Sequence, residues 1–277
     1  MTEGWFAGLA SDDPAARDRI REGSADAPAD WPALAVEAGF AADADEYYAA
    51  LHDAATEAAR TAATERERAD DRQVIHAVRA MDDTERTANE LAERVAEWAG
   101  SRSNDAGTGI EFCRELAREP ADDPADERVR SLAGRAVALD DERAALETFL
   151  ERVLPTVAPN LAALAGPTLA ARLLSLAGGL KSLARTSSST VQLLGAEEAL
   201  FAHLRGTAPS PKHGVIYVHE AVRGTRPEKR GSAARALAGK LTIAARIDHY
   251  AGDRRPELDD DLADRIAQIR SGTERER

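Results

Sequence analysis

Histidine, cysteine and basic side chains carry the most informative chemistry in this sequence, and their spacing excludes several kinds of site. His219 and Glu220 begin like a zinc-protease motif, but Arg223 stands where the second zinc-binding histidine is required. The six histidines form no pair at i, i+4 spacing, and the single cysteine, Cys113, excludes a cysteine-based metal site and an internal disulfide. Walker A loops, G-x-G-x-x-G turns and G-x-S-x-G elbows do not occur. We therefore expect no catalytic residue, no metal, no cofactor and no enzymatic activity.

Two groups of basic residues are candidates for phosphate contact. Lys212 and His213 lie in a proline-containing loop over residues 206–214, where they either reach an RNA backbone or are merely exposed and polar. The second group lies near two glycines and fits either phosphate contact or a solvated face. It consists of Arg223, Arg226, Lys229 and Arg230. By contrast, Arg172 and Arg246 have apolar helical neighbours and are expected to be structural.

Small and hydroxyl-bearing residues near position 190 form a third candidate group. Ser189 with Gln192 fits a capping box at the start of an expected helix, or the hydroxyls here donate to phosphate. Gly195 and Ala196 either allow close approach of RNA or of a partner protein, or serve tight helix packing. The complete set of candidate binding residues is Ser189, Thr190, Gln192, Gly195, Ala196, Lys212, His213, Gly214, Arg223, Arg226, Lys229 and Arg230.

Charge is distributed unevenly along the chain, whose net charge is −13. Residues 1–150 hold 35 acidic and 17 basic residues, whereas residues 151–250 hold 6 acidic and 13 basic residues and all four lysines. A basic segment in an acidic chain indicates an anionic partner, most often nucleic acid. Alternatively, these bases satisfy helix C-termini and internal acids.

The scarcity of lysine suggests a high-salt cytoplasm, because 4 lysines stand against 32 arginines and surface acidity preserves solubility where salt screens charge. An ordinary acidic protein from a GC-rich genome is the alternative. Residues 1–10 lack the basic start and apolar stretch of a signal peptide, and no run of about 18 apolar residues occurs. We expect a soluble cytoplasmic protein with no membrane contact.

The elements that must position these residues are expected to be mainly α-helical, because only 4% of the residues are aromatic and alanine and leucine must fill the core. Residues 1–69 are expected to form a small N-terminal unit that holds half of the aromatic residues, among them Trp5, Phe6 and Trp31. It ends in an alanine-rich helix over residues 43–68.

Residues 70–154 carry two heptad patterns. The first row, over 70–98, consists of Val74, Ala77, Met81, Ala88, Leu91, Val95 and Trp98. The second helix starts at Asp123 and Pro124, a capping residue and a first-turn proline. Its row consists of Leu132, Leu139, Leu146 and Val153, with Ala136, Phe149 and Leu150 beside them. These rows predict an antiparallel coiled-coil hairpin that spaces two domains or dimerises, although two helices of an ordinary bundle fit equally well.

Residues 155–252 differ in sequence pattern from the heptad region, because prolines and glycines separate short apolar segments. The elements expected beyond the two long helices are a short helix over 110–118, a helix over 168–176, an extended piece over 215–218 and a basic helix over 228–250. Residues 253–277 are expected to form a C-terminal helix and a charged tail, with disorder over 271–277.

A series of short motifs follows in a fixed order between Val157 and Tyr250. The series is VAPNL (157–161), GP (166–167), AARLL (170–174), AGGL (177–180), SSTVQLLGAE (188–197), ALF (199–201), PKHGVIY (211–217) and RGSAARALAGK (230–240). It closely resembles the Nop domain, and residues 71–98 resemble the first coiled-coil helix of archaeal members. The composition suits a haloarchaeal representative.

The resemblance implies a protein of the box C/D RNA 2′-O-methylation particle, related to eukaryotic nucleolar Nop proteins and to a spliceosomal one. It implies that residues 1–69 dock a fibrillarin-type methyltransferase and that residues 70–154 pair two copies. It further implies that residues 155–252 form an all-helical Nop domain, which binds box C/D guide RNA at its kink-turn together with a kink-turn-binding ribosomal-type protein. Such a protein is a non-catalytic scaffold. The alternative is a general RNA-binding or RNP-assembly protein without a methyltransferase partner.

Two departures from the family pattern stand out. Glu198 and Ala202 occupy places that are commonly basic, so His203 or Arg205 would have to replace those contacts in part. The segment ahead of the coiled coil is also short for the family, so we expect a reduced N-terminal domain and cannot assume its usual mixed α/β fold.

Overall fold

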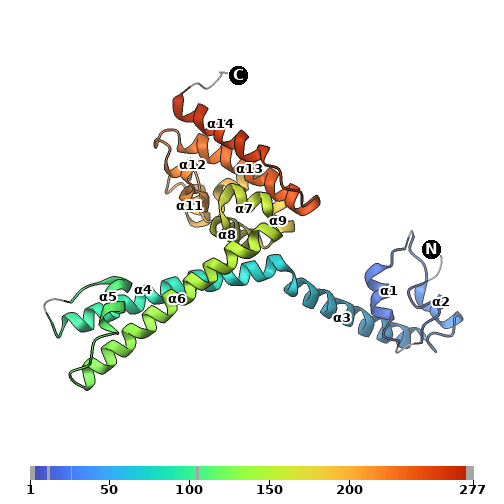
Figure 1. Ribbon diagram of the computed structural model, residues 1–277. Coiled ribbons are helices and arrows are strands. Elements are labelled where there is room, and N and C mark those ends of the chain that lie inside the picture. Colours follow the sequence, from blue (N-terminus) through green and yellow to red (C-terminus); the bar gives the residue numbers. More distant parts are fainter. Residues whose placement is uncertain (1–3, 11–12, 26, 104–105, 273–277) are drawn as a thin grey trace. The chain divides into compact units, whose positions relative to one another are not determined.

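The computed structural model describes residues 4–10, 13–25, 27–103 and 106–272, which form helices joined by turns and contain no strand (Figure 1). The expectation of a mainly α protein is confirmed. The chain divides into two compact units, Met1–Ala69 and Asp70–Arg277. Of the tail expected to be disordered, residues 273–277 lie outside the described part of the chain.

The N-terminal unit is built around an aromatic core. Its helices are α1 (Ala16–Glu22), α2 (Trp31–Glu37) and α3 (Ala44–Arg68). Asp43 caps α3 by accepting a hydrogen bond at 2.9 Å from the amide three residues later. Phe6, Phe40 and Tyr47 are buried, and the Trp5 indole donates to the Tyr47 hydroxyl at 3.2 Å. Aromatic rings therefore form the centre of this small unit.

The second unit begins with a long helical hairpin. Helices α4 (Asp70–Gly100) and α6 (Pro124–Val157) pack side by side, and α5 (Gly109–Leu116) packs against both near the tip (Figure 1). The expected start of the second helix is confirmed, because the Asp123 carboxylate accepts hydrogen bonds at 2.9 Å from the amides of Ala125 and Asp126. Helix α6 continues through Pro155 into the core of the domain that follows.

The apolar seam of the hairpin differs from the predicted one. On α4, the predicted positions Val74, Met81 and Val95 are buried. On α6, the predicted row of Leu132, Leu139, Leu146 and Val153 is only half-buried. The side chains that are buried there are Val129, Ala133, Ala136, Leu150 and Leu154. The predicted row therefore lies at the edge of the seam, where Leu132, Leu146 and Val153 pack against the apolar clusters. Its predicted neighbours Ala136 and Leu150 lie in the seam itself, because small alanines let the two helices approach closely.

A charged layer divides this seam. Between Ala136 and Leu150, the positions that continue the buried row are Asp140, Arg143 and Glu147. The Arg143 guanidinium donates to both carboxylates, at 3.1 Å each. Apolar clusters lie on either side of this layer, one at the tip and one merging with the main core. The hairpin is thus stabilised at its two ends rather than along a continuous seam.

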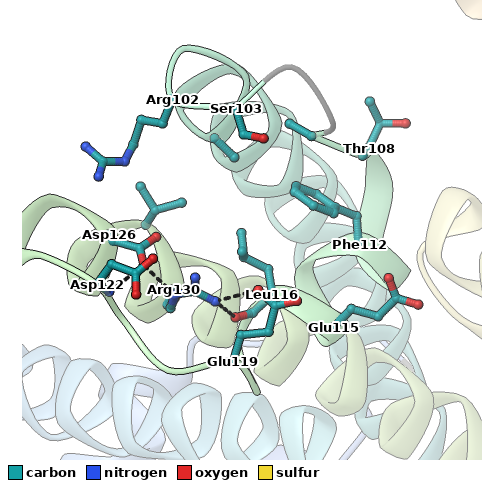
Figure 2. Close-up of a pocket in the computed structure, with 14 residues that line it drawn as sticks. Arg102, Ser103, Thr108, Phe112, Glu115, Leu116, Glu119, Asp122, Asp126 and Arg130 are labelled. Atoms are coloured by element: carbon teal, nitrogen blue, oxygen red, sulfur yellow. Dashed lines mark hydrogen bonds and ion pairs between the residues drawn. The ribbon is translucent and has the colours of Figure 1, made fainter.

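The tip contains a hollow of about 680 Å³ between α4, α5 and the start of α6 (Figure 2). Arg130 lies in its wall, where its guanidinium donates to Asp126 at 2.8 Å, to Glu119 at 2.9 Å and to the Leu116 carbonyl at 2.9 Å. These bonds tie the end of α5 and the loop after it to α6. The hollow therefore results from the way these hydrogen bonds hold α5 and its loop against α6.

The remaining helices form a bundle around the long helix α13 (Arg230–Tyr250) (Figure 1). They are α7 (Pro159–Ala165), α8 (Pro167–Ala177), α9 (Leu180–Arg185), α10 (Ser188–Leu193), α11 (Glu197–Leu204), η1 (Val215–Val218), α12 (Glu220–Arg223) and α14 (Glu257–Ser271). Helices α8 and α13 confirm the helices expected over 168–176 and 228–250, and α5 confirms the one expected over 110–118.

The extended piece expected over 215–218 is wrong, because η1 is a 3₁₀ turn. The amides of Tyr217 and His219 bond to the carbonyls of Gly214 and Ile216, three residues earlier. No strand exists in the described residues to pair with this segment, so its backbone groups find partners locally. The run of β-branched and aromatic residues suggested a strand, but a strand also needs a neighbouring strand to pair with, and the local sequence does not reveal whether one exists.

Buried acids hold the bundle together at helix starts. The Asp248 carboxylate of α13 accepts hydrogen bonds from the amides of Asn160, at 3.0 Å, and Leu161, at 2.8 Å, at the start of α7. On α4, Asp71 accepts one from the Leu180 amide at 2.9 Å, at the start of α9. Carboxylates at helix N-termini are stabilised by the unpaired amides there. The hairpin and the bundle therefore share polar bonds as well as an apolar core.

No single described helix is both long and apolar enough to cross a membrane. Helices α7 and α8 would pass that test together, but they are bent by 117° and most of their apolar residues are buried in the core.

Candidate nucleic-acid interface

The start of α10 is capped by a residue other than the predicted one. The hydroxyl of Ser187 accepts a hydrogen bond from the Thr190 amide at 3.2 Å, so Ser187 is the capping residue. It also lies 2.8 Å from the Ser189 hydroxyl and 3.0 Å from that of Thr190. The predicted capping box of Ser189 with Gln192 is therefore wrong. The result is an exposed cluster of three hydroxyls beside α10.

Three hydrogen bonds join the end of α10 to the loop that precedes η1. The Gln192 side-chain amide donates to the Lys212 carbonyl at 2.6 Å. In the backbone, the Gly214 amide donates to the Gln192 carbonyl at 2.9 Å, and the Val215 amide donates to that of Leu194 at 2.7 Å. Residues that are about twenty positions apart in the sequence are thereby held against each other.

Two glycines are required at this junction. Gly214 lies so close to α10 that an added Cβ would be 2.0 Å from the Leu194 carbonyl oxygen. Gly195 has a φ of +80°, in the left-handed region, and its amide donates to the Glu197 carboxylate at 2.9 Å. Close packing within the protein therefore accounts for Gly214, and the left-handed backbone accounts for Gly195.

A stack of side chains stands beside the glycines. The His213 ring lies over the Tyr217 ring, with centroids 4.6 Å apart and an angle of 22° between the planes. The Arg230 guanidinium carbon lies 5.4 Å from the centre of the Tyr217 ring and is fixed by a hydrogen bond to the Thr225 carbonyl at 3.0 Å. This group combines stacked rings with a positive charge, and such a combination suits contact with flat or anionic ligands.

Burial lowers the pKa of His213 below its ordinary value, and the positive charges of Arg230 and Lys212 lower it further. The ring is therefore neutral at pH 7. In this state it presents one N–H donor and one acceptor rather than a positive charge. Its contribution to an interface is stacking and hydrogen bonding, whereas Lys212 and Arg230 supply charge.

Two hollows meet at this point of the surface. One has a volume of about 560 Å³ and is lined by Gly195, Ala196, Glu197, Glu198, Ala199, His213, Gly214 and Tyr217. The other, of about 570 Å³, shares Gly195, Gly214 and Tyr217 and extends to Arg172 of α8 and Asp82 of α4. Arg172 donates to Asp82 at 2.6 Å, in agreement with its expected structural role.

The basic group predicted near two glycines is divided by the fold. Arg230 joins the stack, whereas the Lys229 ammonium donates to the Ile269 carbonyl at 2.8 Å and Arg226 donates to the Arg270 carbonyl at 3.1 Å. Both carbonyls belong to the last turn of α14, where cations offset the negative end of the helix. The fourth member, Arg223, lies 3.8 Å from Glu220. All four bases thus have partners within the domain, and Arg230 alone among them also joins the aromatic stack.

The sequence reasoning missed Tyr217 as a member of this surface, although it is the ring on which His213 and Arg230 rest. The signal was present, because only four tyrosines occur in the chain and this one follows the loop with Lys212. Helix α11 was equally missed. No residue of α11 is buried, and Phe201 and Leu204 are 56% and 71% exposed.

Comparison with known proteins gives the family. A family model described as "Nop: snoRNA binding domain, fibrillarin" matches residues 43–270. An uncharacterised NOP5 family protein of Methanocaldococcus jannaschii is 33% identical over 273 aligned positions, covering 84% of this chain and 66% of the relative. Nucleolar protein 58 of Debaryomyces hansenii is 31% identical, with coverage of 74% and 46%. This chain thus spans from under half to about two thirds of the length of these relatives.

A solved structure supports the same assignment. The chain superposes on one in the crystal structure of a fibrillarin/Nop5p complex with a TM-score of 0.54 and 25% identity, covering 96% of this chain and 98% of that one. The expected mainly α architecture, with a long helical hairpin followed by an all-helical Nop domain, is confirmed. Since the family model spans the hairpin, the glycine junction and α14, the chain belongs to the Nop family.

Proposed function

We propose that this protein is a non-catalytic scaffold of a box C/D ribonucleoprotein. It binds kink-turn guide RNA together with a kink-turn-binding ribosomal-type protein and positions a fibrillarin-type methyltransferase for guided RNA 2′-O-methylation. The observation that carries the proposal is the junction of Gly195 and Gly214 beside the stack of His213, Tyr217 and Arg230. The family description, with its snoRNA-binding and fibrillarin terms, and the fibrillarin complex among the similar structures support it.

Each part of the chain has a proposed task. Residues 1–69 dock the methyltransferase, residues 70–154 pair two copies, and residues 155–252 bind the RNA with its protein. Residues 253–277 supply α14, whose C-terminal carbonyls hold Arg226 and Lys229. The acidic, lysine-poor composition supports an archaeal and haloarchaeal source, and hence a cytoplasmic particle.

The RNA-binding surface works mainly by shape and hydrogen bonding in this proposal. Salt screens phosphate contacts, so the electrostatic contribution is small in a high-salt cell. The neutral His213, the side chain of Lys212 and the hydroxyls of Ser189 and Thr190 provide stacking, donors and acceptors. Glu198 on the rim of the hollow repels phosphate, which favours a partner protein over RNA at that edge.

The methyltransferase docks on the N-terminal unit in this proposal. An apolar hollow of about 280 Å³ opens there, and its wall includes Trp5, Ile20, Trp31 and Leu51. Exposed apolar concavities rimmed by polar residues are typical of protein–protein contacts.

The alternative function is that of a general RNA-binding or RNP-assembly protein of the Nop type, without a methyltransferase partner. It would still use the same RNA surface.

Binding assays separate the two functions and test the first. Gel shifts would compare kink-turn RNA alone with RNA pre-bound by its kink-turn protein, each followed by addition of fibrillarin. The scaffold proposal expects strong binding only to the RNA–protein complex, and a further shift with fibrillarin. Binding without a further shift would favour the alternative, and equal binding to bare RNA would contradict the composite surface.

A further inference from the structure

Two stretches of the bundle contain no acidic residue. In a chain with 49 acids, residues 152–196 contain no aspartate or glutamate, and neither do residues 229–247. The first stretch includes α9 and the second most of α13, and these two helices pack against each other. Acid-free stretches of this length are unexpected in a chain of net charge −13.

Three basic side chains gather where α9 meets the second half of α13. The Arg246 Nε donates to the Ala184 carbonyl at 3.1 Å, which sets the guanidinium beside the end of α9. Arg185 follows directly, and Lys181 lies one helical turn earlier on the same side of α9. All three side chains are exposed. The structural role expected for Arg246 uses only its Nε. The two terminal nitrogens are therefore left for contact with a ligand.

These three bases have no acidic partner among the ion pairs of the described residues, a property they share with Arg230 and Lys212 of the candidate interface. Within the described residues of the bundle, the bases in ion pairs are Arg172, Arg223, Arg226, Lys240, Arg254, Arg255 and Arg270. Lys181, Arg185 and Arg246 are not among them. The nearby acids are committed elsewhere, because Asp71 and Asp248 are more than nine-tenths buried and bond to helix amides.

Exposed apolar and aromatic side chains complete the face. Ile243 and Tyr250 lie one helical turn on either side of Arg246 and are 42% and 68% exposed. The Tyr250 ring is steadied by His249, with centroids 4.6 Å apart. A basic surface with an available aromatic ring is the combination that binds a nucleic-acid strand by phosphate contact and base stacking.

We propose that this α9–α13 face, formed by Lys181, Arg185, Ile243, Arg246 and Tyr250, is a second RNA-binding surface. It binds the backbone of a further segment of the RNA that the candidate interface holds, so it rests on the proposed function. Arg230 and Arg246 are sixteen residues apart on α13, which separates the two surfaces by about 24 Å. An RNA longer than the kink-turn is therefore needed to reach both.

The test compares three RNAs with four forms of the full chain, all with the kink-turn protein bound. One RNA is the minimal kink-turn. The other two each carry one extra duplex turn, placed at one end or at the other. The variants are Lys181→Glu/Arg185→Glu, which leaves the Arg246 hydrogen bond in place, and Tyr250→Ala. The matched control is Arg118→Glu/Arg152→Glu, which makes the same charge change at exposed hairpin positions.

Wild type is expected to bind one extended RNA about 10-fold or more tighter than the minimal RNA at moderate salt. Lys181→Glu/Arg185→Glu should remove this gain and reduce the salt slope of binding by about two, with unchanged affinity for the minimal RNA. Tyr250→Ala should remove part of the gain, and the control should keep it.

Equal affinity of wild type for minimal and extended RNA would overturn the inference and leave the proposed function intact. So would a loss that the control variant shares. If the variants bind all RNAs normally but lose a protein from the assembled particle, the face binds an acidic protein instead, and the inference is wrong. Failure of wild type to bind even the minimal complex would instead overturn the proposed function.

Discussion

At the scale of single residues, His213 gives a pH-dependent signature of the interface. Its pKa in the folded protein lies below the ordinary value of about 6.5, because the ring is partly buried and faces Arg230 and Lys212. Below about pH 6.5 the unfolded chain therefore binds more protons than the folded one. The stability contributed by the neutral ring is present above this pH and is lost as the pH falls through the folded pKa.

Replacing His213 by glutamine should remove this part of the pH dependence. Urea unfolding of wild type and of the variant, from neutral to mildly acidic pH, should show a steeper loss of stability for wild type. NMR titration of Arg230→Gln should place the His213 pKa higher than in wild type but still below 6.5, since burial is the largest cause. An ordinary pKa in wild type would refute the described stack.

The hydroxyl cluster at α10 permits a sharper comparison. Ser187→Ala should reduce the free energy of unfolding by about 1 kcal/mol, because the Thr190 amide loses its capping oxygen. Ser189→Ala removes no cap and should change stability by less than about 0.5 kcal/mol. Thermal or urea unfolding of the two variants measures both values. The reverse order would restore the capping box that the sequence suggested.

The sequence was informative about which residues meet and uninformative about which bonds they make. The candidates Gln192, Gly195, Lys212 and Gly214 do come together in the fold. Lys229, by contrast, bonds to a carbonyl 40 residues later. A backbone carbonyl leaves no trace in residue type, so no pattern could have separated Lys229 from Arg230.

At the scale of elements, the half-buried leucine row of α6 is the proposed pairing surface of the hairpin. Leu139 and Leu146 are half-buried, and Phe149 beside them is 36% exposed, so a second copy has apolar side chains to cover. Leu139→Asp/Leu146→Asp should make the protein monomeric, and since Leu146 also packs against the main core, the single variant Leu139→Asp should weaken pairing while keeping α6 folded.

Sedimentation in high salt at micromolar concentration, with circular dichroism for helix content, would measure this. Ala144→Asp/Thr148→Asp, at exposed positions of the same helix, is the control and should remain dimeric. A monomeric wild type, or a leucine variant that still dimerises, would contradict pairing through this row.

The hairpin also shows where a heptad pattern stops being sufficient. Asp123 and Pro124 marked the start of α6 correctly, because capping depends on local chemistry. The register of the seam depends on the partner helix. Leucines repeat at Leu132, Leu139 and Leu146, but the close approach of α4 places the smaller Ala133 and Ala136 in the contact.

At the scale of the whole molecule, the division after Ala69 permits a deletion test. Removing residues 1–69 should abolish capture of fibrillarin in a pull-down and leave binding of the RNA–protein complex unchanged. Ile20→Glu/Trp31→Ala, in the apolar hollow of the full chain, should act in the same direction, and Tyr48→Ala is the exposed control. Capture of fibrillarin by the truncated chain would move the docking site to another part of the protein.

The overall fold could be predicted from the sequence because its motifs are numerous and occur in a fixed order. They extend from the capped long helices to the bundle, whose short helices are separated by glycines. The N-terminal unit was less accessible, since its core depends on contacts between rings such as Phe6 and Phe40 that are far apart in the chain. The α9–α13 face could not be predicted from the sequence either, because it depends on α9 and α13 packing against each other.

The central claim is that this chain joins guide RNA to the methyltransferase. The most direct measurement is site-specific 2′-O-methylation of a substrate RNA in a particle reconstituted at high salt from fibrillarin, the kink-turn protein and guide RNA, with and without this chain. The account predicts guided methylation only when the chain is present, and its loss when Gly214 is replaced by a bulky residue that separates α10 from its loop. Methylation at an unchanged rate without the chain would contradict the account.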